Sequence, residues 1–218
     1  ITFEKVGDPL SKIGDPTDYT ITLTNTSSAD TPALTCTVTD AAIGVSETVA
    51  LASGDPAYVI NASAAIPSGA SNPYVNTASV TCSVTGFPNV LDASDSHSVD
   101  LFEPSFTVTK TGDALAKVGD VVNYTVTLSN TSGPGTPALT CTATDSLLGV
   151  IYGPAVLPAG DTVLNPTYTV QAGDPDPLVN TVTLSCSLPS GFTNELADAS
   201  DSHSVDLFEP SFTVSKTG

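Results

Sequence analysis

Two sets of three residues have the side chains needed for covalent chemistry: a lysine, an aspartate and an asparagine in each half of the chain. They are Lys5, Asp40 and Asn76 in the first half, and Lys110, Asp145 and Asn180 in the second. A lysine amine held beside an asparagine amide can attack its side-chain carbonyl while a neighbouring carboxylate moves the protons. Each set is therefore a candidate for an intramolecular isopeptide bond.

Alternating apolar residues place these polar side chains inside the expected fold. Side chains two residues apart on a strand share a face, and Lys110 shares its face with Phe106 and Val108. Asp145 and Asn180 likewise lie on the apolar faces of strands expected at 138–145 and 178–188, and the first half repeats the pattern. A buried lysine without a partner is costly, so we expect each set to meet in a core.

Two alternatives stay open for these residues. The lysine head can instead leave the core at the strand end and form an ordinary ion pair with the aspartate. Asn25 and Asn130 also share faces with apolar residues, so either could replace Asn76 or Asn180 as the asparagine that the lysine attacks in its half of the chain. The crosslink hypothesis resembles the isopeptide bonds of Gram-positive pilin and adhesin sandwiches.

The four cysteines fall two per half at nearly equal spacing: Cys36 with Cys82, and Cys141 with Cys186. One disulfide per half is the simplest interpretation, and it indicates an oxidising, extracellular compartment. No Cys-x-x-Cys spacing or nearby histidine completes a metal site. The cysteines lie on the third and sixth expected strands, which are neighbours in one sheet, unlike the inter-sheet bridge of antibody domains.

Repeated aspartates are weak candidates for calcium, which binds several carboxylate and carbonyl oxygens at one point. They are Asp92, Asp95 and Asp100, which recur as Asp198, Asp201 and Asp206. Asp95 and Asp100 differ in strand parity, however, and no calcium-loop motif is present. We expect a solvated acidic edge that blocks strand addition, and no cofactor.

Asn-x-Ser/Thr sequons occur at Asn25, Asn61, Asn123 and Asn130. Asn25 and Asn130 occupy the same repeat position, and their parity predicts partial burial. Asn61 and Asn123 are therefore the better glycan acceptors.

Composition excludes several classes of protein. The chain carries 23 acidic residues against five Lys and Arg, for a formal net charge of −18, which opposes binding to nucleic acid or to an anionic membrane surface. No apolar run approaches the roughly 20 residues of a membrane span. The two histidines, His97 and His203, lie beside serines in a repeated SDSHSVD, where adjacent strand side chains point apart. We expect no enzymatic activity.

A long repeated stretch, DASDSHSVDLFEPSFTV, occurs at Asp92–Val108 and Asp198–Val214, and each copy is followed by a lysine-containing Thr/Ser-Lys-Thr-Gly. Internal repetition of this length indicates an array of like domains. We expect a first repeat at 1–104, a second at 105–210, and at 211–218 either the first strand of a third repeat or a donor strand for another copy.

The junctions between repeats contain apolar residues and a proline but no glycine. They are Leu101, Phe102, Pro104 and Phe106 at the first junction, and Leu207, Phe208, Pro210 and Phe212 at the second. Proline fixes φ and removes a donor, so we expect a stiff connection with Leu101, Phe102 and Phe106 packed between domains.

Strand periodicity dominates the chain. In the second repeat, strands are expected near 106–111, 121–129, 138–145, 150–157, 162–171, 178–188 and 196–208, with Gly, Pro, Asp and Asn turns between them. About seven antiparallel strands per repeat predict an all-β protein of tandem immunoglobulin-like sandwiches.

The motifs TVTKTGD, VGDVVNYTVTLSNTS, LTCTATD and LVNTVTL, with their counterparts in the first repeat, resemble a tandem surface-protein repeat of bacteria and archaea known as domain of unknown function eleven. The resemblance covers both repeats. It implies an immunoglobulin-like fold in long secreted polypeptides without an assigned enzymatic activity.

These observations predict a structural repeat of an extracellular filament or cell-surface stalk, stiffened by disulfides and short proline-containing junctions. Its partners would be other copies of the same repeat, joined covalently or by strand addition. The alternative is an adhesin that binds glycans or neighbouring cells.

Overall fold

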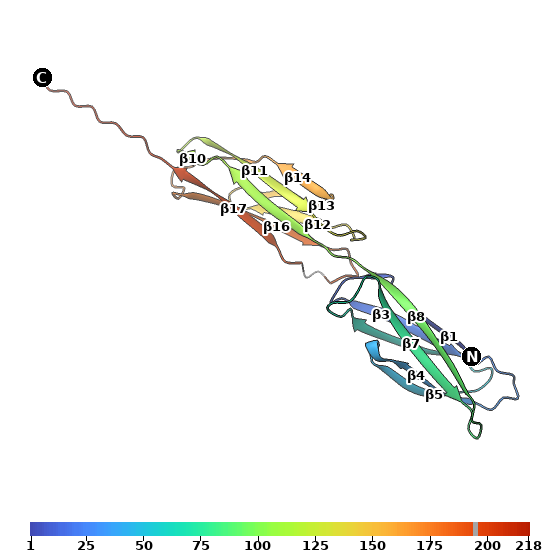
Figure 1. Ribbon diagram of the computed structural model, residues 1–218. Coiled ribbons are helices and arrows are strands. Elements are labelled where there is room, and N and C mark those ends of the chain that lie inside the picture. Colours follow the sequence, from blue (N-terminus) through green and yellow to red (C-terminus); the bar gives the residue numbers. More distant parts are fainter. Residues whose placement is uncertain (194–195) are drawn as a thin grey trace. The chain divides into compact units, whose positions relative to one another are not determined.

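The computed structural model describes residues 1–193 and 196–218, which form two compact units, Ile1–Phe102 and Glu103–Gly218. The division falls after Phe102, whereas the sequence placed it after residue 104. The regular secondary structure of both units is almost entirely strand (Figure 1). No helix in the described ranges is long and apolar enough to cross a membrane.

The first unit is a sandwich of two sheets. Its elements are β1 (Thr2–Gly7), β2 (Leu10–Ser11), β3 (Pro16–Thr24), β4 (Leu34–Asp40), the 3-10 turn η1 (Ala41–Ile43), β5 (Val45–Leu51), β6 (Tyr58–Ala65), β7 (Tyr74–Ser83) and β8 (Val90–Leu101). One sheet has the strand order β1-β3-β6, and the other has the order β2-β8-β7-β4-β5.

The second unit repeats this arrangement. Its strands are β9 (Phe106–Gly112), β10 (Leu115–Ala116), β11 (Val121–Asn130), β12 (Thr140–Asp145), β13 (Gly149–Val156), β14 (Gly160–Leu164), β15 (Thr167–Thr169), β16 (Leu178–Ser187) and β17 (Ala199–Leu207). β11 pairs with β9 along one edge and with β14 and β15 along the other. The facing sheet has the order β10-β17-β16-β12-β13.

The predicted all-β immunoglobulin-like sandwich is confirmed, with two local differences. The fifth strand expected at 162–171 is divided into β14 and β15 at Asn165-Pro166, because proline has no N–H to donate to a ladder. The two-residue strands β2 and β10 pair in parallel with β8 and β17. The chain passes from one sheet to the other between β1 and β2, so the start of each unit contributes to both sheets.

Alternation along the strands builds the core of each unit. In the first, Ile21 and Leu23 of β3 face Cys36 and Val38 of β4, and all four are almost fully buried. The intervening threonines of these strands lie on the outer faces, where a β-branched hydroxyl side chain suits a pleated, hydrated surface.

Each unit contains one disulfide, and both lie within a sheet. Cys36 of β4 is bonded to Cys82 of β7, and Cys141 of β12 to Cys186 of β16. The two members of each pair are directly opposite in the antiparallel register. The bonds therefore fix neighbouring strands and leave the connection between the two sheets to other contacts.

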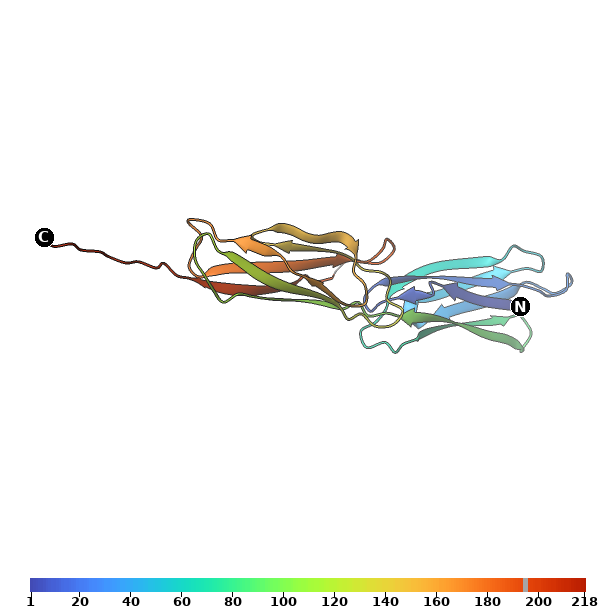
Figure 2. The same ribbon diagram turned by 90° about the horizontal axis from the view of Figure 1, so that it is seen from above.

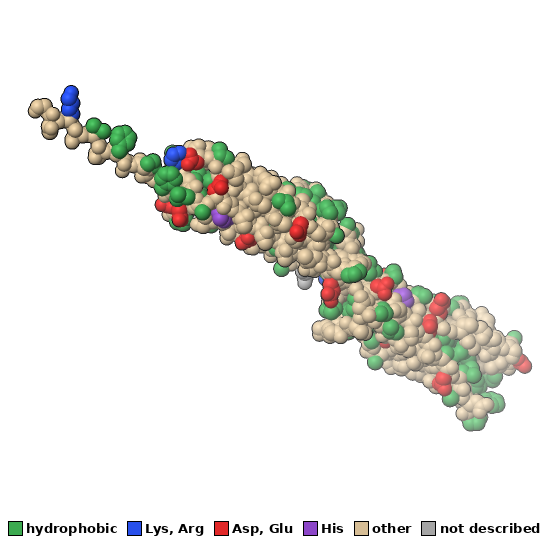
Figure 3. All heavy atoms as spheres, turned by 45° about the horizontal axis from the view of Figure 1, so that its top comes forward, with side chains coloured by type: hydrophobic (Ala, Val, Ile, Leu, Met, Phe, Trp, Pro, Cys, Tyr) green, Lys and Arg blue, Asp and Glu red, His purple; other side chains and the backbone are tan. Residues whose placement is uncertain are grey.

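On the face drawn in Figure 3, acidic side chains are scattered among uncharged residues. Residues 211–218 form no strand and are exposed (Figure 2), with Phe212 and Val214 at 90% and 83% exposure.

Replacing Cys141 and Cys186 together by serine is expected to lower the free energy of unfolding of the second unit by about 2–4 kcal/mol, because the open chain regains the entropy of a long loop. Chemical denaturation measures the change. The Cys36→Ser, Cys82→Ser pair is the matched control and should destabilise the first unit alone. Loss of stability in both units from either pair would contradict independent sandwiches.

Candidate functional site: a buried lysine, aspartate and asparagine in each unit

The three predicted residues of each set come from three strands and both sheets. Lys5 lies in β1 of the three-stranded sheet, whereas Asp40 ends β4 and Asn76 lies in β7 of the five-stranded sheet. All three are buried, with exposures of 3% or less. Lys110, Asp145 and Asn180 have the equivalent places in β9, β12 and β16 and are equally buried.

Each lysine forms an ion pair with its aspartate across the sandwich. Lys5 Nζ contacts Asp40 Oδ2, and both side chains have no exposed surface. Lys110 Nζ lies 2.6 Å from Asp145 Oδ2, again with both side chains fully buried. The ion pair that the alternative expected is therefore present, but the lysine head stays in the core and does not leave it at the strand end.

The other carboxylate oxygen of each aspartate is held by the turn that follows its strand. Asp40 Oδ1 accepts a hydrogen bond from Ala42 N at 3.2 Å and caps η1. Asp145 Oδ1 accepts from Leu147 N at 2.9 Å and from Leu148 N at 3.1 Å. One oxygen is thus fixed by the backbone while the other faces the lysine.

A tyrosine ring lies beneath each ammonium group. Lys5 Nζ lies 4.3 Å from the ring centroid of Tyr19, and Lys110 Nζ lies 4.2 Å from that of Tyr124. At such distances the negative face of the ring attracts a cation. His97 and His203 pack edge-on against these rings at 6.1 Å between centroids, so the histidines support the tyrosines from the last strand of each unit.

The amide nitrogens of the two asparagines lack the hydrogen-bond partners that the lysines and aspartates have. Asn76 Nδ2 and Asn180 Nδ2 are buried and have no hydrogen-bond partner among the described residues. Asn180 Oδ1 accepts from Ser146 Oγ at 3.0 Å, whereas Ala41 occupies the position of Ser146 in the first unit. An unpaired buried amide is unusual, because buried polar groups are nearly always hydrogen-bonded.

A second aspartate holds the lysine backbone. Asp95 Oδ2 accepts from Lys5 N at 2.6 Å, and Asp201 Oδ2 accepts from Lys110 N at 2.6 Å. The sequence pattern suggested Asp95 and Asp201 only as calcium candidates and did not predict the tyrosine beneath the lysine. Recurrence of these residues at the same repeat positions was the available signal.

Calcium binding has no support in the described part of the chain, where no group of three or more acidic, histidine or cysteine side chains is arranged to hold a metal. Asp95 and Asp201 bind backbone amides, and Asp92 Oδ1 accepts from Thr81 Oγ1 at 2.7 Å. Asp100 and Asp206 join neighbouring segments through their backbone N–H groups, and Asp198 lies just before β17.

Two of the four glycosylation candidates have side-chain amides that are hydrogen-bonded to the backbone. Asn25 Nδ2, the atom that would carry a glycan, donates to Leu51 O at 2.9 Å, and Asn130 Nδ2 donates to Leu157 O at 2.9 Å. Their Oδ1 atoms accept from Ser27 N and Ser132 N. The same bonds place both residues away from the lysines. Asn61 and Asn123 are exposed and stay predicted acceptors.

The residues of the two predicted junctions differ in burial. Leu101 packs with Tyr19, Ile66 and Val99 in the core of the first unit. Phe102 is also buried, while Pro104 and Phe106 are half-buried. At the second junction Leu207 is half-buried, and Phe208, Pro210 and Phe212 are exposed.

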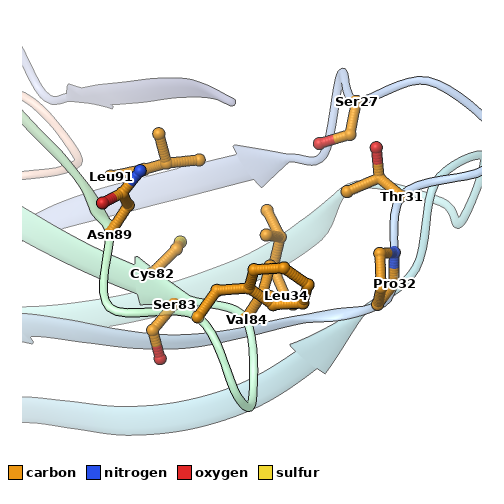
Figure 4. Close-up of a pocket in the computed structure, with 10 residues that line it drawn as sticks. Ser27, Thr31, Pro32, Leu34, Cys82, Ser83, Val84, Asn89 and Leu91 are labelled. Carbon is orange, nitrogen blue, oxygen red and sulfur yellow. The ribbon is translucent and has the colours of Figure 1, made fainter.

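An apolar pocket of about 280 Å³ lies at one end of the first unit (Figure 4). Leu34, Val84, Phe87 and Leu91 line it, and Phe87 is 64% exposed. The sequence did not single out this pocket, because its residues come together only through the loop between β7 and β8.

No family model and no curated protein matches the chain, so membership of the surface-repeat family stays a prediction. Among solved structures, a fragment of the ICAM-5 ectodomain (D1–D4) is similar at 13% identity and a TM-score of 0.36, with 95% of this chain and 53% of that chain covered. The chain thus spans about half the length of that fragment.

Two further similar structures contain tandem domains. The mouse nectin-like molecule 4 ectodomain (Ig1–Ig3) has 10% identity and a TM-score of 0.29, with 98% of this chain and 66% of that chain covered. A chimeric titin Z1Z2 tandem has 13% identity and a TM-score of 0.28, with 95% and 99% covered. Each unit is an immunoglobulin-like sandwich. That statement rests on the strand order of the sheets. Structural similarities with TM-scores this low give no information about function.

The close packing around the tyrosine gives a testable consequence. A Cβ atom at Gly112 would lie 2.7 Å from Tyr124 Cδ1 and 2.9 Å from Asn123 O. Gly112→Ala should therefore destabilise the second unit by about 1–3 kcal/mol in chemical denaturation. Gly133→Ala is the control, because its Cβ would have no neighbour closer than 3.7 Å, and equal effects of the two variants would refute the packing argument.

Burial raises the pKa of Tyr19 to about 12, so the folded state favours the neutral phenol more than the unfolded state does. The contribution of Tyr19 to the free energy of unfolding is then fully present below about pH 10, the pKa of tyrosine in the unfolded chain. This contribution falls as the pH rises towards 12. Burial also raises the pKa of Tyr124, so the test is a difference: Tyr19→Phe should flatten this fall in denaturation curves for the first unit. An unchanged pH dependence would contradict the prediction.

Proposed function

We propose that the chain is a structural repeat segment of an extracellular filament or cell-surface stalk. The observation that carries this proposal is the recurrence of one strand sequence in two settings. SFTVTKTG at 105–112 includes β9 and places Val108 and Lys110 in the core of the second unit. SFTVSKTG at 211–218 differs at one residue and is exposed without a sheet partner.

The apolar alternation of 211–218 is that of an opening strand. Phe212, Val214 and Lys216 correspond to Phe106, Val108 and Lys110. An extended segment with this pattern forms a stable strand only when it pairs with a sheet. We propose that it opens a further covalent unit; its alternative role is a donor strand for a neighbouring copy, the mode in which an extended segment completes another chain's sheet.

The internal construction of each unit suits a part that bears tension. A disulfide fixes two strands within one sheet, and a buried ion pair joins that sheet to the other. The cysteines also fit an oxidising compartment outside the cytosol. The proposal assigns no catalytic activity to the chain.

Adhesion is the second candidate, and the pocket beside Phe87 is the observation that favours it. Binding sites for small ligands are commonly concave, apolar and partly aromatic. The pocket is small and belongs to the first unit, so the filament proposal accounts for more of the chain.

Antibodies against the chain should label intact, unpermeabilised cells of the organism that encodes it, in rows along surface fibres under the electron microscope. Repetition of like units along a fibre is the reason to expect rows. A strain without the gene is the control. Labelling that requires permeabilised cells would overturn the proposal, and labelling confined to fibre tips would favour adhesion.

A further inference from the structure

The buried asparagines pose a problem that the ion pairs leave unsolved. In each unit the lysine and aspartate form an ion pair with each other, yet the asparagine Nδ2 is buried with no hydrogen-bond partner in the described part of the chain. Leaving such a group unpaired in the interior is destabilising. The same residue is unsatisfied in both units, so the arrangement is a repeated feature of the fold.

The tyrosine connects the asparagine to the ion pair. Burial raises the pKa of Tyr19 and Tyr124; beside this main effect, Asn76 and Asn180 lower these pKa values and the charges of Asp40 and Asp145 raise them, so both side chains lie near each tyrosine hydroxyl. The lysine Nζ atoms lie over the same two rings, 4.3 and 4.2 Å from their centroids. Lysine, aspartate and asparagine therefore surround one aromatic ring in each unit.

The strand register brings the lysine backbone to the same place. Lys5 N donates to Asp95 of β8, and Asp95 lies directly opposite Ala78 of β7. Asn76 is two residues from Ala78, on the same face of β7. In the second unit Lys110 N donates to Asp201, which lies opposite Val182, two residues from Asn180.

We propose that each unit closes an isopeptide bond between its first strand and its penultimate strand, joining Lys5 Nζ to Asn76 Cγ and Lys110 Nζ to Asn180 Cγ. The crosslink would form in the folded protein, where the three side chains are held together away from water. It would replace each buried charge pair and unpaired amide with a neutral amide beside a carboxyl group.

The reaction needs no oxidant or further reactant. A proton passes from the lysine ammonium to Asp40 or Asp145, and the free amine attacks Cγ of the asparagine. The bond from Cγ to Nδ2 then breaks, and protons transferred through the carboxyl group let Nδ2 leave as ammonia. Reactants and products balance in atoms and in net charge: an ammonium, a carboxylate and the primary amide of the asparagine become a carboxylic acid, a secondary amide and ammonia.

The second unit holds an additional group suited to this step. Ser146 Oγ donates to Asn180 Oδ1, which draws electron density from the carbonyl carbon and stabilises negative charge on the oxygen as the amine attacks. Asn25 and Asn130 are excluded as acceptors, because their amides bind the carbonyl groups of Leu51 and Leu157.

The bond would change how a unit transmits tension. A pull on the first unit enters through β1 and leaves through β8. With Lys5 bonded to Asn76, the covalent path passes from β1 directly to β7, so residues 6–75 would carry no load. The proposal stands independently of the filament function, because the bond can be detected in the isolated chain.

Intact mass of the reduced, denatured chain is the first test. We expect a deficit of two ammonia molecules relative to the sequence, one for each unit. A mass equal to the calculated one would overturn the proposal. A succinimide at an exposed asparagine also loses ammonia, so the position of the deficit must be mapped.

Digestion with trypsin locates the ammonia deficit, because the chain contains only five lysines and no arginine and therefore gives few peptides. With free Lys5 and Lys110, complete digestion of the reduced chain releases 1–5, 6–12, 13–110, 111–117, 118–216 and the dipeptide 217–218. With both bonds, cleavage fails at Lys5 and Lys110, and the pieces 1–12, 13–117 and 118–216 stay joined as one product. Separate linear peptides would overturn the proposal even if ammonia were missing.

Variants in the second unit use the first as an internal control. Asn180→Ala should reduce the deficit to one ammonia and release 118–216, whereas Asn130→Ala should keep both deficits. Asp145→Asn should also leave one deficit, because it removes the proton carrier. A second deficit that persists in Asn180→Ala would overturn the assignment of the acceptor, and the wild-type map decides the main question whether or not a variant folds.

Discussion

The buried ion pair between the two sheets is the interaction on which each unit depends. Moving a lysine and an aspartate out of water is expensive, and a pair in the interior is tolerated only when its geometry and remaining hydrogen bonds are well satisfied. The surroundings meet this demand: the turn after β4 or β12 holds one carboxylate oxygen, the tyrosine ring lies under the ammonium group, and an aspartate of the last strand binds the lysine N–H.

The disulfide and the ion pair constrain different parts of the sandwich. Cys36 and Cys82 join adjacent strands that already share a hydrogen-bond ladder, so their bond restricts the unfolded chain more than it ties the two layers. The lysine reaches from one sheet to the other, and an isopeptide there would add the covalent connection that the cystine does not supply. Together they would fix β1, β4 and β7 to one another in the first unit, and their counterparts in the second.

Units of this construction suit the fibre that we propose, because each can be repeated along a chain. Each sandwich has its own core, and its first strand passes from one sheet to the other before the second long strand begins. The strand sequence at 211–218 shows the same alternation without a sheet to receive it. This combination accounts for the repeated chain better than an open binding cleft does, since the pocket beside Phe87 is small and confined to the first unit.

The sequence by itself determined the strands, the two repeats and the inward orientation of Lys5, Asp40 and Asn76, because a two-residue period fixes which side chains share a face. Only the tertiary structure decided which of two asparagines lies at the lysine, since Asn25 and Asn76 have equivalent parity. It also decided the roles of Asp95 and Tyr19, and the assignment of Leu101 to the first core. These depend on which strands face each other across the sandwich, and alternation within a strand carries no information about that pairing.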